Sequence, residues 1–359
     1  MTLATKKVKK HGLWYELTHT HSLTEQEYKR MVRKIIAIVG LFFLISFIVF
    51  FAVAWYGGIN TVLYVFSTID YTVYALAFIC VLVGYLISFA KWNYFMQILG
   101  LKVPFGKNLA VYLSLYSMEL TPGRIGRVLT AYTLNRITNI RFINIVPIVT
   151  MDIFTDFLGI AMLALIAAAF FSQYFWYVVV VDGILLLPFV FLLNPWFFKI
   201  LKKLGGKNGR IKSFTLYGEE YFTSQSKLNK PRVYLLAIMF TLPSAFFYAL
   251  SLYFSLFAIG AVVHLGGSVS IYSISQVAGM VTSLPGNIGV TDGFLVGLLE
   301  DIFHLSGGVS SAVTIMTRIA SLWFGVILGG AFLAYTIRFW KPNAKKKGRK
   351  RKGLRIKLR

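Results

Sequence analysis

The sequence has 359 residues, of which 57% are hydrophobic and only 14% are charged. A soluble domain carries roughly 25% charged residues, so the excess apolar side chains must face lipid rather than water. This composition argues against an ordinary soluble enzyme, and a single cysteine, Cys80, excludes a disulfide framework within the chain.

The net charge of +24 is concentrated in four blocks of lysine and arginine. Eight basic residues lie in residues 6–34, seven in 91–141, nine in 199–232 and twelve in 338–359, which leaves Arg318 alone in an apolar segment. Because cytoplasmic loops of membrane proteins are enriched in Lys and Arg, we predict that all four blocks are cytoplasmic.

Six apolar runs are long enough to span a bilayer, which takes about 20 helical residues. The connections after the first, third and fifth runs contain no Lys or Arg. Six spans with both termini in the cytoplasm therefore satisfy every basic block, and we expect a multi-pass protein of the cell membrane. The runs are residues 35–57, 71–90, 143–171, 174–193, 233–263 and 309–337.

Two further apolar segments, residues 105–141 and 267–305, are each interrupted by a Pro-Gly break. Residues 120–126 read LTPGRIG and residues 284–289 read LPGNIG, so both contain Pro-Gly-x-Ile-Gly. We predict two re-entrant helical hairpins, because broken backbone at membrane depth is tolerated only where protein or a watery cavity surrounds it.

The order of elements indicates a duplication. Residues 35–171 and 174–337 each read span, span, re-entrant segment, span, and the second copy begins on the opposite side of the membrane. Such an inverted-topology repeat is typical of secondary transporters, whose substrate site lies near the midplane at broken helices. The alternative is an old duplication kept for packing alone. The predicted fold class is thus an all-α membrane protein with six transmembrane helices and two re-entrant hairpins.

Three basic segments complete the predicted organisation: a cytoplasmic arm (residues 1–34), a cytoplasmic connection (194–232) and a polybasic tail (338–359). Such a tail on a membrane protein more often meets anionic lipid head groups than nucleic acid. We therefore expect anionic membrane lipids, and no nucleic acid, among the partners.

Arg318 is the residue that most strongly indicates a functional site. A cation in a spanning helix costs from about 3 to over 10 kcal/mol unless it has a partner or faces a watery cavity. We expect it to meet an anionic head group or to pair with Asp152 or Asp156. These two carboxylates, four residues apart, share one helix face. Asp152 and Asp156 either bind a proton or cation that is coupled to transport, or have a structural role.

Arg124 and Arg127 follow the first break at the start of a helix, where free N–H groups favour an anion and an arginine fork can bind phosphate. The alternative is two ordinary cytoplasmic basic residues. Glu119 could pair with either one. The predicted substrate site comprises Pro122, Gly123, Arg124, Arg127, Pro285, Gly286, Asn287 and Arg318, and the predicted coupling or ion-pair residues are Glu119, Asp152, Asp156 and Asp292.

With these motifs the chain resembles, over residues 35–338, the lysylphosphatidylglycerol synthase/flippase transmembrane family. Arg127 departs from the acidic residue usual there, Asn287 replaces a common second glycine, and Asp292 is plausible as the acidic residue expected after the second motif. The resemblance implies lipid translocation. The sequence contains no counterpart of the soluble aminoacyl-transfer domain of the fused enzyme, so synthase activity is not implied.

We therefore expect a flippase for an anionic lipid, namely a phospholipid, a polyprenyl phosphate or a polyprenyl-linked sugar. The alternatives are an integral-membrane glycosyl- or aminoacyl-transferase, and a non-catalytic membrane subunit of a separate transferase. The sequence contains no nucleophile elbow, P-loop or convincing metal-ligand spacing, so we expect no enzyme activity, cofactor or metal.

The topology can be tested with single cysteines in a Cys80→Ser background. Cysteines at Asn60 and Gly266 should react with a membrane-impermeant thiol reagent added outside, and one at Lys207 should not, because the nine-residue basic block is predicted to be cytoplasmic. External labelling at Lys207 would contradict the predicted topology.

Overall fold

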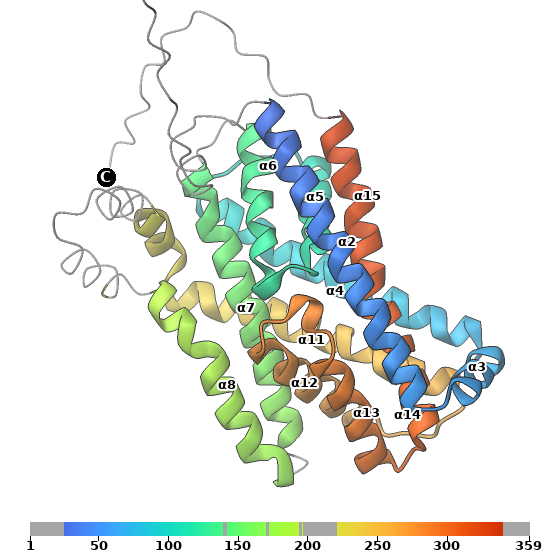
Figure 1. Cartoon of the computed structure of the whole chain (residues 1–359). Coiled ribbons are helices and arrows are strands. Elements are labelled where there is room, and N and C mark those ends of the chain that lie inside the picture. The colour runs from blue at the N-terminus through green and yellow to red at the C-terminus, as the bar shows by residue number, and fades with distance from the viewer. Residues whose placement is uncertain (1–24, 139–141, 170–171, 194–195, 197–220, 340–359) are drawn as a thin grey trace, which may run out of the picture.

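The computed structural model describes residues 25–138, 142–169, 172–193, 196 and 221–339, and every regular element within them is a helix (Figure 1). The predicted tail beyond residue 339 and most of the predicted arm and cytoplasmic connection lie outside the described residues. The fold is therefore all-helical, as the sequence predicts.

The first helices form a sharp corner. Helix α2 (Glu25–Tyr56) is followed by α3 (Ile59–Thr68) at an angle of 97°. Gly58 at the corner has φ 80°, a conformation that glycine adopts without steric cost. The segment expected to be a simple external connection thus contains a helix. Helix α3 leads into α4 (Tyr71–Ile98), where the N–H groups of Thr72 and Val73 donate hydrogen bonds to the side chain of Asp70.

Two broken helical segments occupy the places predicted for the hairpins. The first comprises α5 (Phe105–Ser114), the 3₁₀ turns η1 (Leu115–Met118) and η2 (Pro122–Arg127), and α6 (Val128–Thr138). The second comprises α12 (Leu265–Val281), the 3₁₀ turn η3 (Pro285–Asn287) and α13 (Val290–Phe303), and its two helical arms pack against each other.

The two Pro-Gly-x-Ile-Gly copies share one unusual backbone feature. The third position is left-handed in both, with φ 58° at Arg124 and 56° at Asn287. Asparagine tolerates this conformation better than arginine does. The two copies therefore agree at the third position, whereas the final glycine is left-handed in the second copy, at Gly289, and not at Gly126 in the first.

The remaining helices are long. They are α7 (Phe142–Ala168), α8 (Ser172–Leu193), α11 (Pro231–Ala258), α14 (Gly307–Arg318) and α15 (Phe324–Phe339), and a π-helical turn, η4 (Ile319–Trp323), joins the last two. Single π turns inside helices are frequent at functional sites, and this one begins directly after Arg318.

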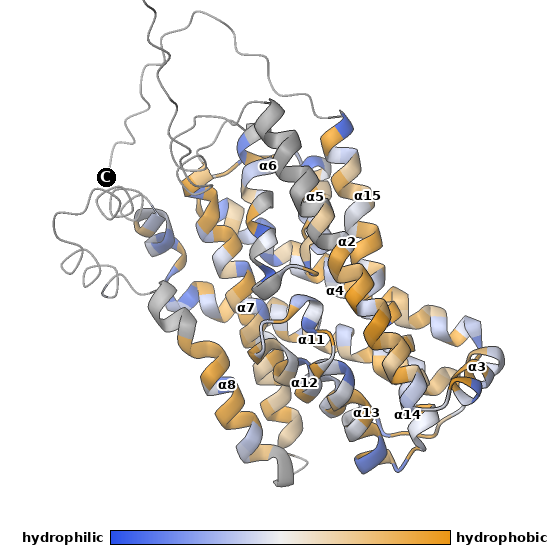
Figure 2. Ribbon diagram, in the orientation of Figure 1, coloured by the Kyte–Doolittle hydropathy of each residue, from blue (hydrophilic) through white to orange (hydrophobic). Residues whose placement is uncertain are grey.

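Four helical segments are long and apolar enough to cross a membrane: α4, α7, α11 and the continuous segment Gly307–Arg338. A fifth arises if residues 40–56 of α2 and the bent helix α3 form one span. The apolar part of α8, Phe175–Leu187, is shorter. Hydrophobic residues also dominate the described length of α8 and α15 (Figure 2). The protein is thus a multi-pass membrane protein, while the count of six spans stays a prediction.

The two halves interlock. Helix α4 of the first half packs along α11 of the second half. The last long helix of each half packs on the first arm of the other half's broken segment, α7 on α12 and α15 on α5. One large apolar core runs through these contacts and includes Trp92, Phe95, Tyr112 and Leu256. The segments 120–126 and 284–289 are thereby held between the halves.

The close packing of the second hairpin can be tested at Gly279 on α12. A Cβ atom there would overlap Thr291 Oγ1 and lie 2.8 Å from Asn287 Cβ. We expect Gly279→Ala to lower the free energy of unfolding by about 1–3 kcal/mol, as overpacking does. Gly293→Ala on α13 is the control, because a Cβ atom added there would have no neighbour within 4 Å. Equal thermal unfolding of both variants in detergent would contradict this packing.

Candidate functional site

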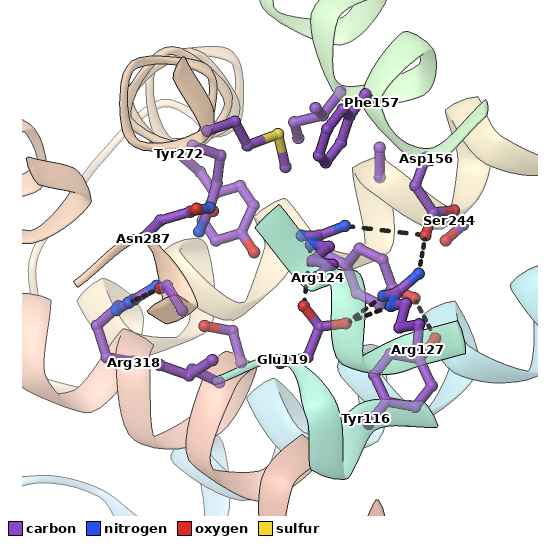
Figure 3. A pocket seen from close by; sticks show the side chains of 18 of the residues that line it. Tyr116, Glu119, Arg124, Arg127, Asp156, Phe157, Ser244, Tyr272, Asn287 and Arg318 are labelled. Carbon is purple, nitrogen blue, oxygen red and sulfur yellow. Dashed lines mark hydrogen bonds and ion pairs between the residues drawn. The ribbon is translucent and has the colours of Figure 1, made fainter. Parts of the chain in front are cut away.

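A cavity of about 110 Å³ lies where the two Pro-Gly breaks meet (Figure 3). Glu119, Thr121 and Arg124 line it from the first half, and Gly286 and Asn287 line it from the second. A single water needs roughly 10–15 Å³ by this kind of measure, so the space holds several waters or a phosphate-sized group.

The two breaks touch directly. The backbone N–H of Gly286 donates a hydrogen bond of 3.1 Å to the carbonyl oxygen of Glu119. Leu120, Ile288 and Leu322 form a small apolar cluster beside this bond. A side chain at Gly286 would place its Cβ 3.0 Å from Leu120, so glycine permits the approach. The two halves are therefore in direct contact at their breaks, beside the cavity.

The first charge network joins α4, the first break and α7. Lys91 is fully buried, and its Nζ lies 3.1 Å from Asp152 Oδ1 and 2.6 Å from Asp156 Oδ1. Arg127 Nη1 lies 3.3 Å from Asp152 Oδ2 and 2.9 Å from Asp156 Oδ2, and the same guanidinium pairs with Glu119. Burying charge is tolerated when the charges are paired and hydrogen-bonded, and this network meets that condition.

Arg124 is the more exposed of the two arginines with which this network lines the cavity. Its Nε lies 3.0 Å from Glu119 Oε2, and its Nη1 lies 3.9 Å from Asp156 Oδ2. The guanidinium carbon lies 5.2 Å from the centre of the Phe157 ring, within the range of a cation–π contact. The side chain is 18% exposed, against 4% for Arg127. A ligand in the cavity would therefore meet Arg124 before Arg127.

Arg318 belongs to a separate ion pair in the second half. Its Nε lies 2.9 Å from Asp292 Oδ1, and both side chains are buried. Asp292 Oδ2 accepts a hydrogen bond of 2.7 Å from the N–H of Gly289. Arg318 Nη2 also donates to the carbonyl oxygen of Gly286. The expected pairing with Asp152 or Asp156 is therefore corrected: those acids hold Lys91 and Arg127, and Asp292 holds Arg318.

The two halves arrange their buried charges with opposite polarity. In the first half the cation Arg127 follows the break and the acids lie on the next helix, α7. In the second half the acid Asp292 follows the break and the cation Arg318 lies on the next helix, α14. Either polarity neutralises buried charge equally well. The pairing therefore ties each break to the last long segment of its own half.

The structure places the other predicted residues as follows. Asn287 and Gly286 line the cavity, whereas Pro285 is buried at the start of η3. Pro122 and Gly123 lie in η2 at the first break. The predicted arginines of both halves, Arg124, Arg127 and Arg318, thus border one cavity, and Asp156 joins them.

Sequence reasoning missed Lys91 as a site residue. It follows an apolar run and looks like a cytoplasmic flanking charge, but α4 continues seven residues beyond it, to Ile98. The available signal was the apolar and aromatic content of residues 92–98, which keeps the lysine inside the helix and away from its end.

A row of hydroxyl groups crosses the cavity wall. Tyr116 Oη lies 3.2 Å from Tyr248 Oη, which lies 3.3 Å from Ser88 Oγ, and Ser88 Oγ lies 2.6 Å from Ser244 Oγ. A hydroxyl can donate or accept a hydrogen bond. These hydroxyl groups can therefore donate to or accept from a polar ligand by rotating their O–H bonds, without movement of heavy atoms.

Within the described residues, no group of three or more His, Cys, Asp or Glu side chains could hold a metal ion. The chemistry available at the cavity is therefore that of paired arginines, carboxylates and hydroxyls.

The buried network gives a stability prediction. Lys91→Met leaves two buried carboxylates with one fewer cation, and breaking a buried ion pair in this way costs about 3–5 kcal/mol. Lys91→Met combined with Asp152→Asn restores the balance and should recover most of the loss. The control is Lys227→Met at an exposed position. Thermal unfolding in detergent measures all of them, and a double variant no more stable than the single one would refute the charge balance.

Comparison with protein families gives a match over most of the chain. The family described as "Lysylphosphatidylglycerol synthase TM region" matches residues 37–329, which include both breaks, both charge networks and the cavity. No curated protein matches the chain significantly. On the match that covers most of its length, the chain belongs to the family of the lysylphosphatidylglycerol synthase transmembrane region.

Proposed function

We propose that the protein is a lipid flippase, which moves an anionic lipid between the two leaflets of the cell membrane. The observation that carries the proposal is the shared cavity, because Arg124 of the first half and Arg318 of the second half both line it. Membership of the family adds a lipid-related membrane function. The candidate substrates remain a phospholipid, a polyprenyl phosphate and a polyprenyl-linked sugar.

The matched packing of the halves supports alternating access. If the two halves are interchanged, the contact of α7 with α12 becomes the contact of α15 with α5. The contact of α4 with α11 stays the same. These contacts support our proposal of an inverted repeat with a two-fold axis in the membrane plane, in which six spans and two re-entrant hairpins would surround the site. Rocking one half against the other would then expose the cavity to either leaflet.

The ion pairs explain how a head group is selected. Each arginine that lines the cavity already has a carboxylate partner, Glu119 or Asp156 in the first half and Asp292 in the second. A lipid phosphate can replace a carboxylate as the acceptor of an arginine fork. An uncharged head group cannot, and breaking the pair without a replacement costs about 3–5 kcal/mol.

The size of the cavity limits which part of a lipid can enter it in this conformation. At about 110 Å³, it admits a phosphate-sized group but not the body of a lipid. The hydrogen bond from Gly286 to Glu119 joins the two breaks in this state. We propose that transport requires the breaks to separate from this state.

The transferase and the accessory-subunit alternatives differ from this proposal in what they predict. A transferase alters the lipid chemically, and an accessory subunit moves no lipid by itself. We propose that the purified protein in liposomes moves lipid and leaves its mass unchanged. A new covalent lipid product formed with an activated donor would favour the transferase.

The site is tested at Arg318. Arg318→Ala should abolish lipid movement in proteoliposomes, because among the described residues it removes the one cation of the second half that lines the cavity. Arg318→Lys should restore it only in part, since a lysine lacks the planar fork that binds phosphate in two places. Arg338→Ala is the matched control, because Arg338 is exposed on the same continuous helix.

Each variant must first elute as a monodisperse protein. Movement is then measured for each candidate lipid as the fraction reaching the outer leaflet. An Arg318→Ala protein that folds normally and moves lipid at the parental rate would refute the proposed site.

A further inference from the structure

A carboxylate that the site does not use lies in the middle of α8. Asp182 is the eleventh of the 22 residues of this helix. At 1.5 Å per residue it has roughly 15 Å of helix on either side, about half the apolar thickness of a bilayer. If α8 spans the membrane, Asp182 therefore lies near the midplane.

Asp182 faces inward. It is 4% exposed, and on the same stripe of the helix Val178, one turn before it, and Leu185, one turn after it, belong to the large apolar core. The outward stripe carries the exposed residues Tyr177 and Ile184 instead. The carboxyl group thus takes a place that an apolar side chain would fill at lower free energy.

Neither oxygen of Asp182 has a hydrogen-bond partner in the part of the chain that the structure describes. The other buried acids there differ: Asp152 and Asp156 pair with Lys91 and Arg127, and Asp292 pairs with Arg318. An ionised carboxylate in apolar surroundings needs such a partner. A neutral carboxylic acid needs it far less.

The helices that pack against α8 bring no counter-charge. The largest contacts of α8 are with α7 and α12. The titratable groups of α7 are Asp152 and Asp156, which are committed to the first network. Helix α12 offers only Tyr272, which lines the cavity. No cluster of acids or imidazoles among the described residues completes a metal site around Asp182. A proton is therefore the one cation whose binding needs no further ligand.

We propose that Asp182 is a proton-binding site: its carboxyl carries a proton in this state and releases it to water in another state of the transport cycle. Helix α8 touches both α7 and α12, which belong to different halves. Movement of the second hairpin against α7 would change what surrounds Asp182. The site would thereby couple a proton gradient to lipid movement. The coupling rests on the proposed flippase function, whereas the protonated state does not.

Dicyclohexylcarbodiimide provides a test without any lipid substrate. This apolar reagent adds a protonated carboxyl group across its C=N bond: the carboxyl oxygen bonds to the central carbon, the proton goes to a nitrogen, and rearrangement leaves a stable N-acylurea. Peptide mass spectrometry of the full chain should find the adduct on Asp182 in the parental protein and in Asp182→Glu. The adduct should be lost in Asp182→Asn, and the ion-paired residues Asp152 and Asp292 should stay unmodified.

An intact protein that is unmodified at Asp182, or that is modified at Asp152 or Asp292 instead, would overturn the proton site. The coupling is tested separately by imposing a pH gradient across proteoliposomes. Parental protein and Asp182→Glu should move lipid faster under one direction of the gradient than without it, and Asp182→Asn should lose that response. Parental lipid movement that ignores the gradient would overturn the coupling. If the parental protein moves no lipid while Asp182 is still modified, the flippase proposal fails and the proton site stands.

Discussion

The structure depends on the pairing of charge inside an apolar scaffold. Lys91, Arg127 and Asp152 are buried, as are Arg318 and Asp292, and Asp156 beside them is only 17% exposed. Buried ions persist only if each finds a partner of opposite charge with good geometry. This requirement fixes the first break against α4 and α7, and the second break against α14, so the positions of both turns follow from it.

In the flippase that we propose, the same requirement would link the structure to transport. A cavity whose arginines are already neutralised is stable when empty, yet a phosphate can enter by replacing a carboxylate partner. Arg124 and Arg318 approach the cavity from opposite halves, so a head group held by both would bridge the halves. Binding would then bias the equilibrium between the states in which the breaks touch and those in which they separate, because a ligand shifts such an equilibrium only by differential contact.

Long apolar runs, the two breaks and the arginines around the cavity could be predicted from sequence, because helix length, Pro-Gly interruption and an isolated charge in an apolar run leave local signals. The ion-pair partner of Arg318 could not be predicted from the sequence. Asp292 and the acids of α7 are equally plausible by charge, and only the packing of α13 on α14 selects Asp292. The role of Lys91 was hidden because it depends on where α4 ends.

A covalent link between the two breaks tests most directly whether lipid passes between them. Cysteines at Leu120 and Ile288, which pack in one cluster, would be placed in a Cys80→Ser background and linked, with the link verified by intact mass. If lipid passes between the breaks, linked protein should stop moving lipid in proteoliposomes, and reduction of the link should restore the rate, while each single-cysteine protein stays active. Movement at the parental rate by fully linked protein would contradict the account.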